Sequence, residues 1–268
     1  MSIDLSGQVA IVTGGSRGIG REVARAFAVA GATVAVTARD EAKLAETVAI
    51  IEANGGTAHA FAMDVADTQS VADGFKAIHE QLGAVDVLVN NAGVGGTFKA
   101  LQDITVEEWW YVQEVNVKGV FACTQAVLPK MIARGSGRII NMGSFIGIRP
   151  TPDAISYSVS KAALMRLTDS IALAVKDKGV QVFVISPGMV KTDMTDAIPF
   201  IDEIPEEAFT PIEKSGELCV KLASGVADQL TGRMIHASAY DFDNLLANAD
   251  SIVENDELIL HLKEPADN

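Results

Sequence analysis

Cysteine is scarce in this chain, and long apolar runs are absent. Its 268 residues contain two cysteines, Cys123 and Cys219, each in an apolar neighbourhood. We therefore expect two buried thiols and no disulfide, which is typical of a reducing compartment such as the cytoplasm. No stretch approaches the roughly 20 consecutive apolar residues of a membrane-spanning helix. The first residues also lack the basic region and apolar run of a signal peptide.

Basic residues are in short supply as well. Lys and Arg together number 21 against 35 acidic residues, which gives a formal net charge of −14. This charge disfavours binding to a nucleic-acid backbone or to an anionic membrane. Apolar residues make up 49% of the chain, enough for a sizeable core. We expect a cytoplasmic α/β protein that binds neither nucleic acid nor membrane.

A glycine-rich segment near the N-terminus carries the first functional signal. The β-branched run 9–12 leads into Thr-Gly-Gly-Ser-Arg-Gly-Ile-Gly at 13–20, and a helical apolar pattern follows at once. Glycines in this context permit a tight turn and let a pyrophosphate approach the helix N-terminus. The alternative is an ordinary strand-to-helix turn. The pattern favours a dinucleotide site that includes Gly14, Ser16, Arg17, Gly18, Ile19 and Gly20.

The end of the next strand, 33–37, bears on the choice of cofactor. An acidic residue there bonds the ribose 2′-hydroxyl of NAD, whereas an arginine accommodates the 2′-phosphate of NADP. Here the strand runs into Ala-Arg39-Asp40, and Arg17 is placed to reach the same phosphate. This favours NADP over NAD. In the competing interpretation Arg39 is solvent-exposed at a helix start, and Asp40 bonds the ribose.

Strands and helices alternate along the rest of the main body. The strands are continuously apolar, which predicts a parallel sheet covered on both faces. Asp64 and Val65 follow strand 57–62, where Asp64 is placed to bond an adenine edge. Its alternative role is to cap helix 67–81, although Asp67 suits that position better. The remaining predicted elements are helices 41–54, 157–177 and 213–223, two helical stretches within 105–133, and strands 85–89, 138–142, 180–185 and 233–236.

Tyr157 and Lys161 form the second functional signal. They are four residues apart at the start of an apolar helical pattern, so both lie on one helix face. A nearby ammonium favours the phenolate and moves the pKa of the phenol from about 10 toward working pH. The alternative is a packed ring beside a solvated lysine. Asn116 also lies among apolar helical positions, and a buried amide needs a hydrogen-bond partner.

Beyond Thr192 the pattern loosens. Residues 193–212 contain three prolines, several acids and scattered apolar residues, which we interpret as a mobile lid over the substrate. From Tyr240 onward there are eight acidic residues against one lysine, interspersed with leucines and isoleucines. We expect a catalytic domain over 1–240 and an acidic tail over 241–268 that packs on the domain or on a partner subunit.

Six motifs in order resemble the short-chain dehydrogenase/reductase family. They are Thr13-Gly-x-x-x-Gly18-x-Gly20, Asn90-Asn91-Ala92-Gly93, Asn116, Ser144, Tyr157-x-x-x-Lys161 and Pro187-Gly188. The match covers residues 7 to about 192, more loosely to 236, and looks closest to the 3-oxoacyl-carrier-protein reductase-like, single-domain branch. The resemblance implies one Rossmann-type doubly wound domain with about seven parallel strands flanked by helices.

The resemblance also implies roles for individual residues. Tyr157 would exchange a proton with the substrate oxygen, and Ser144 would hydrogen-bond that oxygen. Lys161 would bind the nicotinamide ribose and depress the pKa of the tyrosine, while Asn116 would hold a water molecule linked to Lys161. The remaining cofactor contacts would come from Asn91, Ala92, Gly93, Pro187, Gly188, Val190 and Thr192.

The sequence therefore predicts an NADP(H)-dependent oxidoreductase that interconverts a small-molecule ketone or aldehyde and an alcohol, without a metal. Relatives commonly form homodimers and homotetramers, partly through a final strand, but this chain departs from them after Gly232. A non-catalytic dinucleotide-binding sensor or scaffold is the alternative from another class. Within the enzyme class the alternative is 3-oxoacyl-carrier-protein reduction, which needs a basic docking patch such as Arg134, Arg138 and Arg149.

Overall fold

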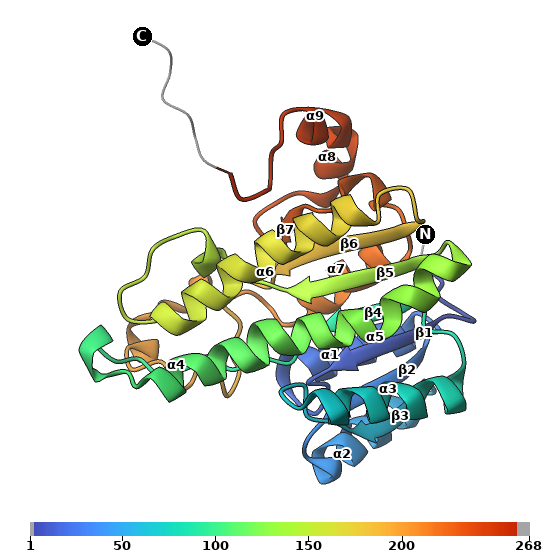
Figure 1. Ribbon diagram of the computed structural model, residues 1–268, viewed down its shortest axis with the longest axis horizontal. Coiled ribbons are helices and arrows are strands. Elements are labelled where there is room, and N and C mark those ends of the chain that lie inside the picture. The colour runs from blue at the N-terminus through green and yellow to red at the C-terminus, as the bar shows by residue number, and fades with distance from the viewer. Residues whose placement is uncertain (1–2, 262–268) are drawn as a thin grey trace.

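One parallel β-sheet of seven strands organises the fold, in a computed structural model that describes residues 3–261 (Figure 1). The order across the sheet is β3-β2-β1-β4-β5-β6-β7, and every neighbouring pair is parallel. The predicted doubly wound sheet of about seven strands is confirmed. The strands are β1 (Val9–Thr13), β2 (Thr33–Ala38), β3 (Thr57–Ala62), β4 (Val87–Asn90), β5 (Gly137–Met142), β6 (Val180–Ser186) and β7 (Met234–His236).

Helices cover both faces of this sheet. In Figure 1, α3, α5 and α6 lie in front of the strands, whereas α1 and α7 lie behind them. The helices are α1 (Gly18–Val29), α2 (Glu41–Ala53), α3 (Thr68–Leu82), α4 (Val106–Gln113), α5 (Gly119–Arg134), α6 (Ile155–Ala174), α7 (Glu213–Ala223), α8 (Phe242–Ala247) and α9 (Ala249–Glu254). Among the described residues no helix is both long and apolar enough to cross a membrane.

Two hydrophobic cores explain why the strands are continuously apolar. Successive residues of a strand point to opposite faces of the sheet. In β1, Val12 packs into the core shared with α1, α2 and α7, whereas Ile11 packs into the core shared with α3 and α5. In β5, Ile140 and Ile139 divide between the same two cores. Each strand therefore needs apolar side chains on both faces.

The topology places the candidate site at one edge of the sheet. Strand β1 pairs with β2 on one side and with β4 on the other, so the direction of winding reverses between them. Ligands of open α/β sheets bind at such a switch point, outside the carboxyl ends of the strands. Since all strands are parallel, the segments that follow β1, β4, β5 and β6 meet at this edge.

A chain of buried polar side chains joins the strands beneath that edge. The amide of Asn90 in β4 donates to Thr124 Oγ1 at 3.2 Å and to Asn141 Oδ1 at 2.9 Å. Asn141 in β5 then donates to Thr168 Oγ1 of α6 at 2.9 Å. All four side chains are at most 2% exposed. Because a buried amide is costly unless it is hydrogen-bonded, this chain fixes β4, β5, α5 and α6 in one arrangement.

The helical region 105–133 differs in detail from the sequence-based expectation. Asn116 does not lie within the second α-helix but in a π-helical turn, Glu114–Lys118, between α4 and α5. Such turns often mark functional positions in a helix. The wider turn leaves the Asn116 side chain, which is 0% exposed, aimed at the loop after β4. Apolar spacing alone does not distinguish this turn from a continuous helix.

The segments beyond β6 pack on the same domain. Residues 193–212 contain only two short 3-10 turns, Ile201–Glu203 and Glu206–Ala208. Within the predicted tail, α8 and α9 contribute Leu245, Ala249 and Ile252 to the core that contains α1 and α7. The last part of the predicted tail, 262–268, lies outside the described residues.

Candidate active site

The glycine turn after β1 packs against the loop after β4. The hydroxyl of Thr13, which is buried, accepts hydrogen bonds from the backbone N–H groups of Asn91 and Ala92, both at 3.0 Å. The Asn91 amide donates to Thr13 O at 2.9 Å and to Gly14 O at 3.2 Å. A Cβ atom at Gly20 would overlap Gly14 O and Asn91 Nδ2. The third glycine of the motif is therefore required by this close contact.

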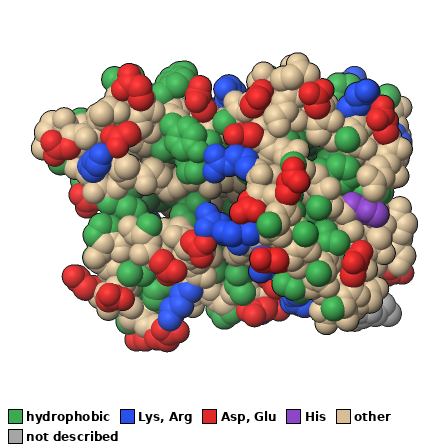
Figure 2. Space-filling view, turned by 90° about the horizontal axis from the view of Figure 1, so that it is seen from below, with side chains coloured by type: hydrophobic (Ala, Val, Ile, Leu, Met, Phe, Trp, Pro, Cys, Tyr) green, Lys and Arg blue, Asp and Glu red, His purple; other side chains and the backbone are tan. Residues whose placement is uncertain are grey.

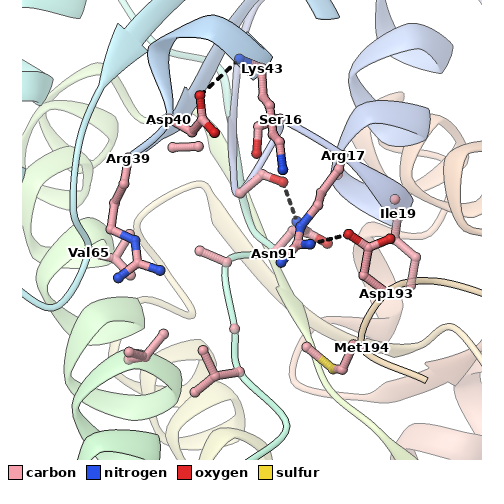
Figure 3. Close-up of a pocket in the computed structure, with 18 of the residues that line it drawn as sticks. Ser16, Arg17, Ile19, Arg39, Asp40, Lys43, Val65, Asn91, Asp193 and Met194 are labelled. Carbon is pink, nitrogen blue, oxygen red and sulfur yellow. Dashed lines mark hydrogen bonds and ion pairs between the residues drawn. The ribbon is translucent and has the colours of Figure 1, made fainter. Parts of the chain in front are cut away.

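A cavity of about 400 Å³ lies over this turn, at the switch point of the sheet (Figure 3). The residues that line it come from the glycine turn, the end of β2 and the loops after β3, β4 and β6. Most of the predicted cofactor residues are among them: Gly14, Ser16, Arg17, Gly18, Ile19, Gly20, Arg39, Asp64, Val65, Asn91, Ala92, Gly93 and Thr192. The glycine turn after β1 and the loop after β4 thus converge on one cavity, whose concave shape suits a dinucleotide.

Five predicted cofactor residues do not line this cavity: Tyr157 and Lys161 of α6, and Pro187, Gly188 and Val190. The last three follow β6 at the same edge of the sheet. Gly188 has a φ of +82°, and a Cβ there would overlap the Thr210 hydroxyl. Val190 is 3% exposed. In this structure the three residues after β6 shape the backbone that brings Thr192 to the cavity.

Sequence reasoning missed several residues that line the cavity. Some extend the segments of predicted residues: Ala38, Lys43, Met63, Val94, Asp193 and Met194. Asp40, which the competing interpretation assigns to the ribose, also lines the cavity. Two others, Tyr111 and Val115, come from α4 and the π-helical turn. Their spacing carries no cofactor signal, since only the packing of α4 beside the β4 loop brings them to the cavity.

The cavity contains charges of both signs. Arg17 forms an ion pair with Asp193 on the opposite rim. Arg39 extends into the cavity (Figure 3). Its Nη1 atom is 4.0 Å from Asp64 Oδ2 and 3.4 Å from the Tyr111 hydroxyl. The Asp40 carboxylate accepts the Lys43 N–H at 3.1 Å and so caps α2. Each of the two guanidinium groups therefore lies beside a carboxylate at the cavity.

Tyr157 and Lys161 lie on one face of α6, as their spacing predicts. The Lys161 Nζ atom is 5.2 Å from the centre of the Tyr157 ring and donates to Met142 O at 2.7 Å. Ser144, which follows β5, hydrogen-bonds to Tyr157. The carboxyl end of β5 and the start of α6 thus bring the three side chains together.

The pKa of Tyr157 departs from the sequence-based expectation. Burial penalises the phenolate and raises the pKa of Tyr157 to about 12, while the hydrogen bond with Ser144 acts in the opposite direction. Burial also lowers the pKa of Lys161 to about 8. Burial therefore opposes the depression of the tyrosine pKa that an ammonium near the ring would cause. At neutral pH the phenol therefore retains its proton.

Asn116 uses its side chain to connect the β4 loop to α6. Its Oδ1 accepts the Val94 N–H at 2.9 Å, and its Nδ2 donates to Val94 O at 2.9 Å and Ser160 Oγ at 3.0 Å. Ser160 in turn donates to Tyr157 O at 2.7 Å. Both polar atoms of the amide thus bond to protein groups, and Asn116 connects the β4 loop to the start of α6.

The described residues contain no group of His, Cys, Asp and Glu side chains suited to a metal ion. A buried phenol that hydrogen-bonds to a serine and lies near a lysine can exchange a proton with a substrate oxygen. Beside it lies a cavity that suits a dinucleotide, the class of cofactor that carries hydride. Proton and hydride transfer together interconvert a carbonyl group and an alcohol.

Comparison with known proteins finds relatives that are similar to this chain in sequence. The chain is 37% identical over 238 residues to a 3-oxoacyl-[acyl-carrier-protein] reductase of Staphylococcus aureus, covering 85% of this chain and 96% of that one. It is 36% identical over 264 residues to a short chain dehydrogenase of Pseudocercospora fijiensis, covering 92% and 84%.

Solved structures agree with these sequence matches. The crystal structure of a gluconate 5-dehydrogenase from Burkholderia cenocepacia, in complex with NADP and tartrate, aligns with a TM-score of 0.81 at 30% identity. The alignment covers 88% of this chain and 95% of that chain. The short chain dehydrogenase family profile matches residues 8–199. The chain belongs to the short-chain dehydrogenase/reductase family, whose members are NAD(P)-dependent oxidoreductases of CH–OH groups.

Proposed function

We propose that this chain is an NADP(H)-dependent oxidoreductase that interconverts a small-molecule ketone or aldehyde and an alcohol. The observation that carries the proposal is the grouping of Ser144, Tyr157 and Lys161 at the sheet edge that also holds the dinucleotide-sized cavity. The nicotinamide, when bound, supplies or accepts the hydride. Tyr157 supplies or accepts the proton, and Ser144 orients the substrate oxygen.

The protonation state of Tyr157 suits the proton-donor role that carbonyl reduction requires at neutral pH. A phenol with a pKa of about 12 is a proton donor there, as reduction of a carbonyl requires. Lys161, with a pKa of about 8, is close to working pH and is placed to return a proton to the site. Segment 193–212, which contributes Asp193 and Met194 to the cavity rim, is proposed as the substrate lid.

The preference for NADP is supported by the placement of Arg39. Its guanidinium lies in the cavity, and the Asp40 carboxylate, which also lines the cavity, is engaged as the cap of α2. The binding test is a titration of the purified protein with NADPH and NADH, followed by nucleotide fluorescence, and then a panel of ketones and alcohols. NADPH binding with turnover supports the proposal. Nucleotide binding without turnover of any panel member supports the non-catalytic sensor instead.

Replacing Arg39 by alanine is expected to weaken NADPH binding by about 10- to 100-fold, since a hydrogen bond to a charged group contributes about 1.5–3 kcal/mol. The affinity for NADH, which lacks the 2′-phosphate, is expected to change little. The measurement is the Kd of each nucleotide by fluorescence titration. Lys76→Ala is the control, because it removes one cation from an α3 side chain that pairs with Glu80 outside the cavity. Equal loss for both nucleotides would contradict the phosphate role of Arg39.

In the described part of the chain, Arg134, Arg138 and Arg149 do not gather into the basic patch considered for an acyl carrier protein. Arg134 pairs with Asp86, and Arg138 pairs with Asp228. Arg138 lies at the amino end of β5, while Ser144 and Arg149 follow its carboxyl end. Figure 2 shows acidic and basic side chains interspersed on the face in view, without an extended basic area. These observations favour a small-molecule substrate.

Exposed apolar side chains on the helices support a homodimer or homotetramer. They include Val106 and Trp110 on α4, Phe121 on α5 and Val159 on α6, and they are between 43% and 75% exposed. A second copy of the chain would remove them from water. The two cysteines are buried free thiols, which agrees with the cytoplasmic location proposed here.

A further inference from the structure

The segment that follows α9, Asn255–His261, lies along the outer edge of β7. We name it the C-terminal strap. Met234 of β7 donates its backbone N–H to Leu258 O at 2.8 Å, so the edge strand of the sheet is partly paired by the strap. Two arginine side chains also bind it: Arg166 of α6 donates to Leu260 O, and Arg233 forms an ion pair with Asp256 at 3.7 Å.

The backbone of the strap is held in an unusual conformation. Asp256 and Leu258 have φ angles of +50° and +60°, and they are the non-glycine residues with positive φ in the described part of the chain. A non-glycine side chain in this region is unfavourable unless surrounding contacts maintain it. The arginine and backbone contacts supply that restraint. The strap is therefore a fitted part of the domain and not a loose extension.

The strap packs on the cluster that also supports the catalytic loop. Leu260 and Phe145 both pack against the buried side chains of Met165, Val184 and Met234. Phe145 directly follows Ser144, and its ring centre lies 4.5 Å from that of His236 at the end of β7. The strap thus covers the cluster on which the residue next to Ser144 rests.

Met165 links this cluster to the catalytic face of α6. It follows Lys161 by four residues and Tyr157 by eight, so all three lie along one side of the helix. The 3-10 turn Phe145–Gly147 packs on the same helix, since a Cβ at Gly147 would lie 2.7 Å from the Lys161 carbonyl carbon. The positions of Ser144 and Tyr157 therefore depend on one packed unit that includes Met165 and Phe145.

We propose that the C-terminal strap positions Ser144 for catalysis, with Leu260 as a positioning residue. Leu260 closes the cluster of Met165, Val184 and Met234, and the closed cluster holds Phe145 and the turn that begins at Ser144. This inference rests on the proposed oxidoreductase function. It assigns part of the acidic C-terminal segment to the active site of the same chain.

Two full-chain variants test the strap. Leu260→Ala removes the packing, and Arg166→Met removes the donor to Leu260 O from a side chain that is 58% exposed. The matched control is Leu173→Ala, a truncation on α6 at a side chain 75% exposed. For both strap variants we expect kcat to fall by about tenfold, less than the roughly 10²-fold that a 1 Å misplacement can cost. The NADPH KM is expected to stay unchanged.

Backbone hydrogen exchange gives a readout that does not need turnover. The Ile146, Gly147 and Ile148 N–H groups bond to Ser144 Oγ, Ser144 O and Phe145 O, respectively. We expect exchange across 144–148 to accelerate in both strap variants and to stay unchanged in Leu173→Ala. If 144–148 exchanges at the wild-type rate in both strap variants, the proposal is wrong. If exchange accelerates while wild-type protein turns over no substrate, the proposed function fails and the structural role of the strap stands.

Discussion

Tyr157→Phe is expected to lower kcat by about 10²- to 10⁴-fold, the usual contribution of a general acid. The substitution removes the one hydroxyl that hydrogen-bonds to Ser144 and keeps the ring beside Lys161. Because neither the cavity lining nor Arg39 changes, NADPH is expected to bind with wild-type affinity. The measurements are steady-state turnover with the best carbonyl substrate and the Kd of NADPH by fluorescence.

Tyr240→Phe is the matched control for this substitution. It removes a phenol hydroxyl from a ring that packs near His236 and Phe145, with centroid separations of 6.5 Å to each. The ring is retained, so we expect nearly unchanged turnover. If Tyr157→Phe kept more than about a tenth of wild-type kcat, proton transfer by Tyr157 would be incorrect, since loss of a general acid costs at least about 10²-fold.

Lys161→Met is expected to abolish most turnover and at the same time to stabilise the fold at pH 7. Lys161 is 4% exposed, and burial lowers its pKa from 10.5 to about 8. This shift corresponds to about 3 kcal/mol by which burial disfavours the charged amine. Loss of its hydrogen bond to Met142 O offsets about 1 kcal/mol. The net expectation is a gain of about 2 kcal/mol in the free energy of unfolding.

The sign of the pH dependence distinguishes this explanation from a packing effect. Between pH 8 and 10.5 the unfolded chain holds the lysine proton while the folded protein releases it, so wild-type stability rises with pH there. The advantage of Lys161→Met should be fully present below pH 8 and shrink toward pH 10 in denaturant titrations. Above pH 10 the raised pKa of Tyr157 lowers stability in both proteins.

Lys178→Met is the control, because it shortens an exposed lysine near the end of α6. It should change neither turnover nor the free energy of unfolding by more than about 0.5 kcal/mol. If the gain in the free energy of unfolding of Lys161→Met did not depend on pH, packing and not the buried charge would explain the higher stability. Loss of turnover together with a pH-dependent gain in the free energy of unfolding would indicate that the chain retains a destabilising buried lysine for its chemistry.

The local patterns in the sequence were sufficient for the sheet and for much of the cavity. A strand buried on both faces must be apolar throughout, so the apolar runs of β1, β4 and β6 predict strands. The glycine turn follows directly from β1, and its residues line the cavity as expected. Tyr157 and Lys161 share a helix face because four residues approximate one helical turn. Each of these features depends on residues close together in the chain.

Contacts between distant segments were decided only by the tertiary structure. Arg17 and Asp193 are 176 residues apart, and nothing in the sequence indicates that they pair. In the folded chain they line the same cavity and form an ion pair. Tyr111 reaches the same cavity because α4 packs beside the β4 loop. The C-terminal strap likewise acquires its relation to Ser144 through the cluster around Met165.

The pKa of Tyr157 illustrates why the sequence determines some properties of a site and the tertiary structure determines others. The sequence places an ammonium near the phenol, and that proximity alone lowers the pKa. The folded chain also encloses the ring, and desolvation of the phenolate raises the pKa to about 12. Spacing along a helix determines which groups are neighbours, so the sequence by itself determined that Tyr157 and Lys161 lie together, and it determined the sheet that carries them. How much water surrounds those groups depends on every segment packed around them, and only the tertiary structure decided that.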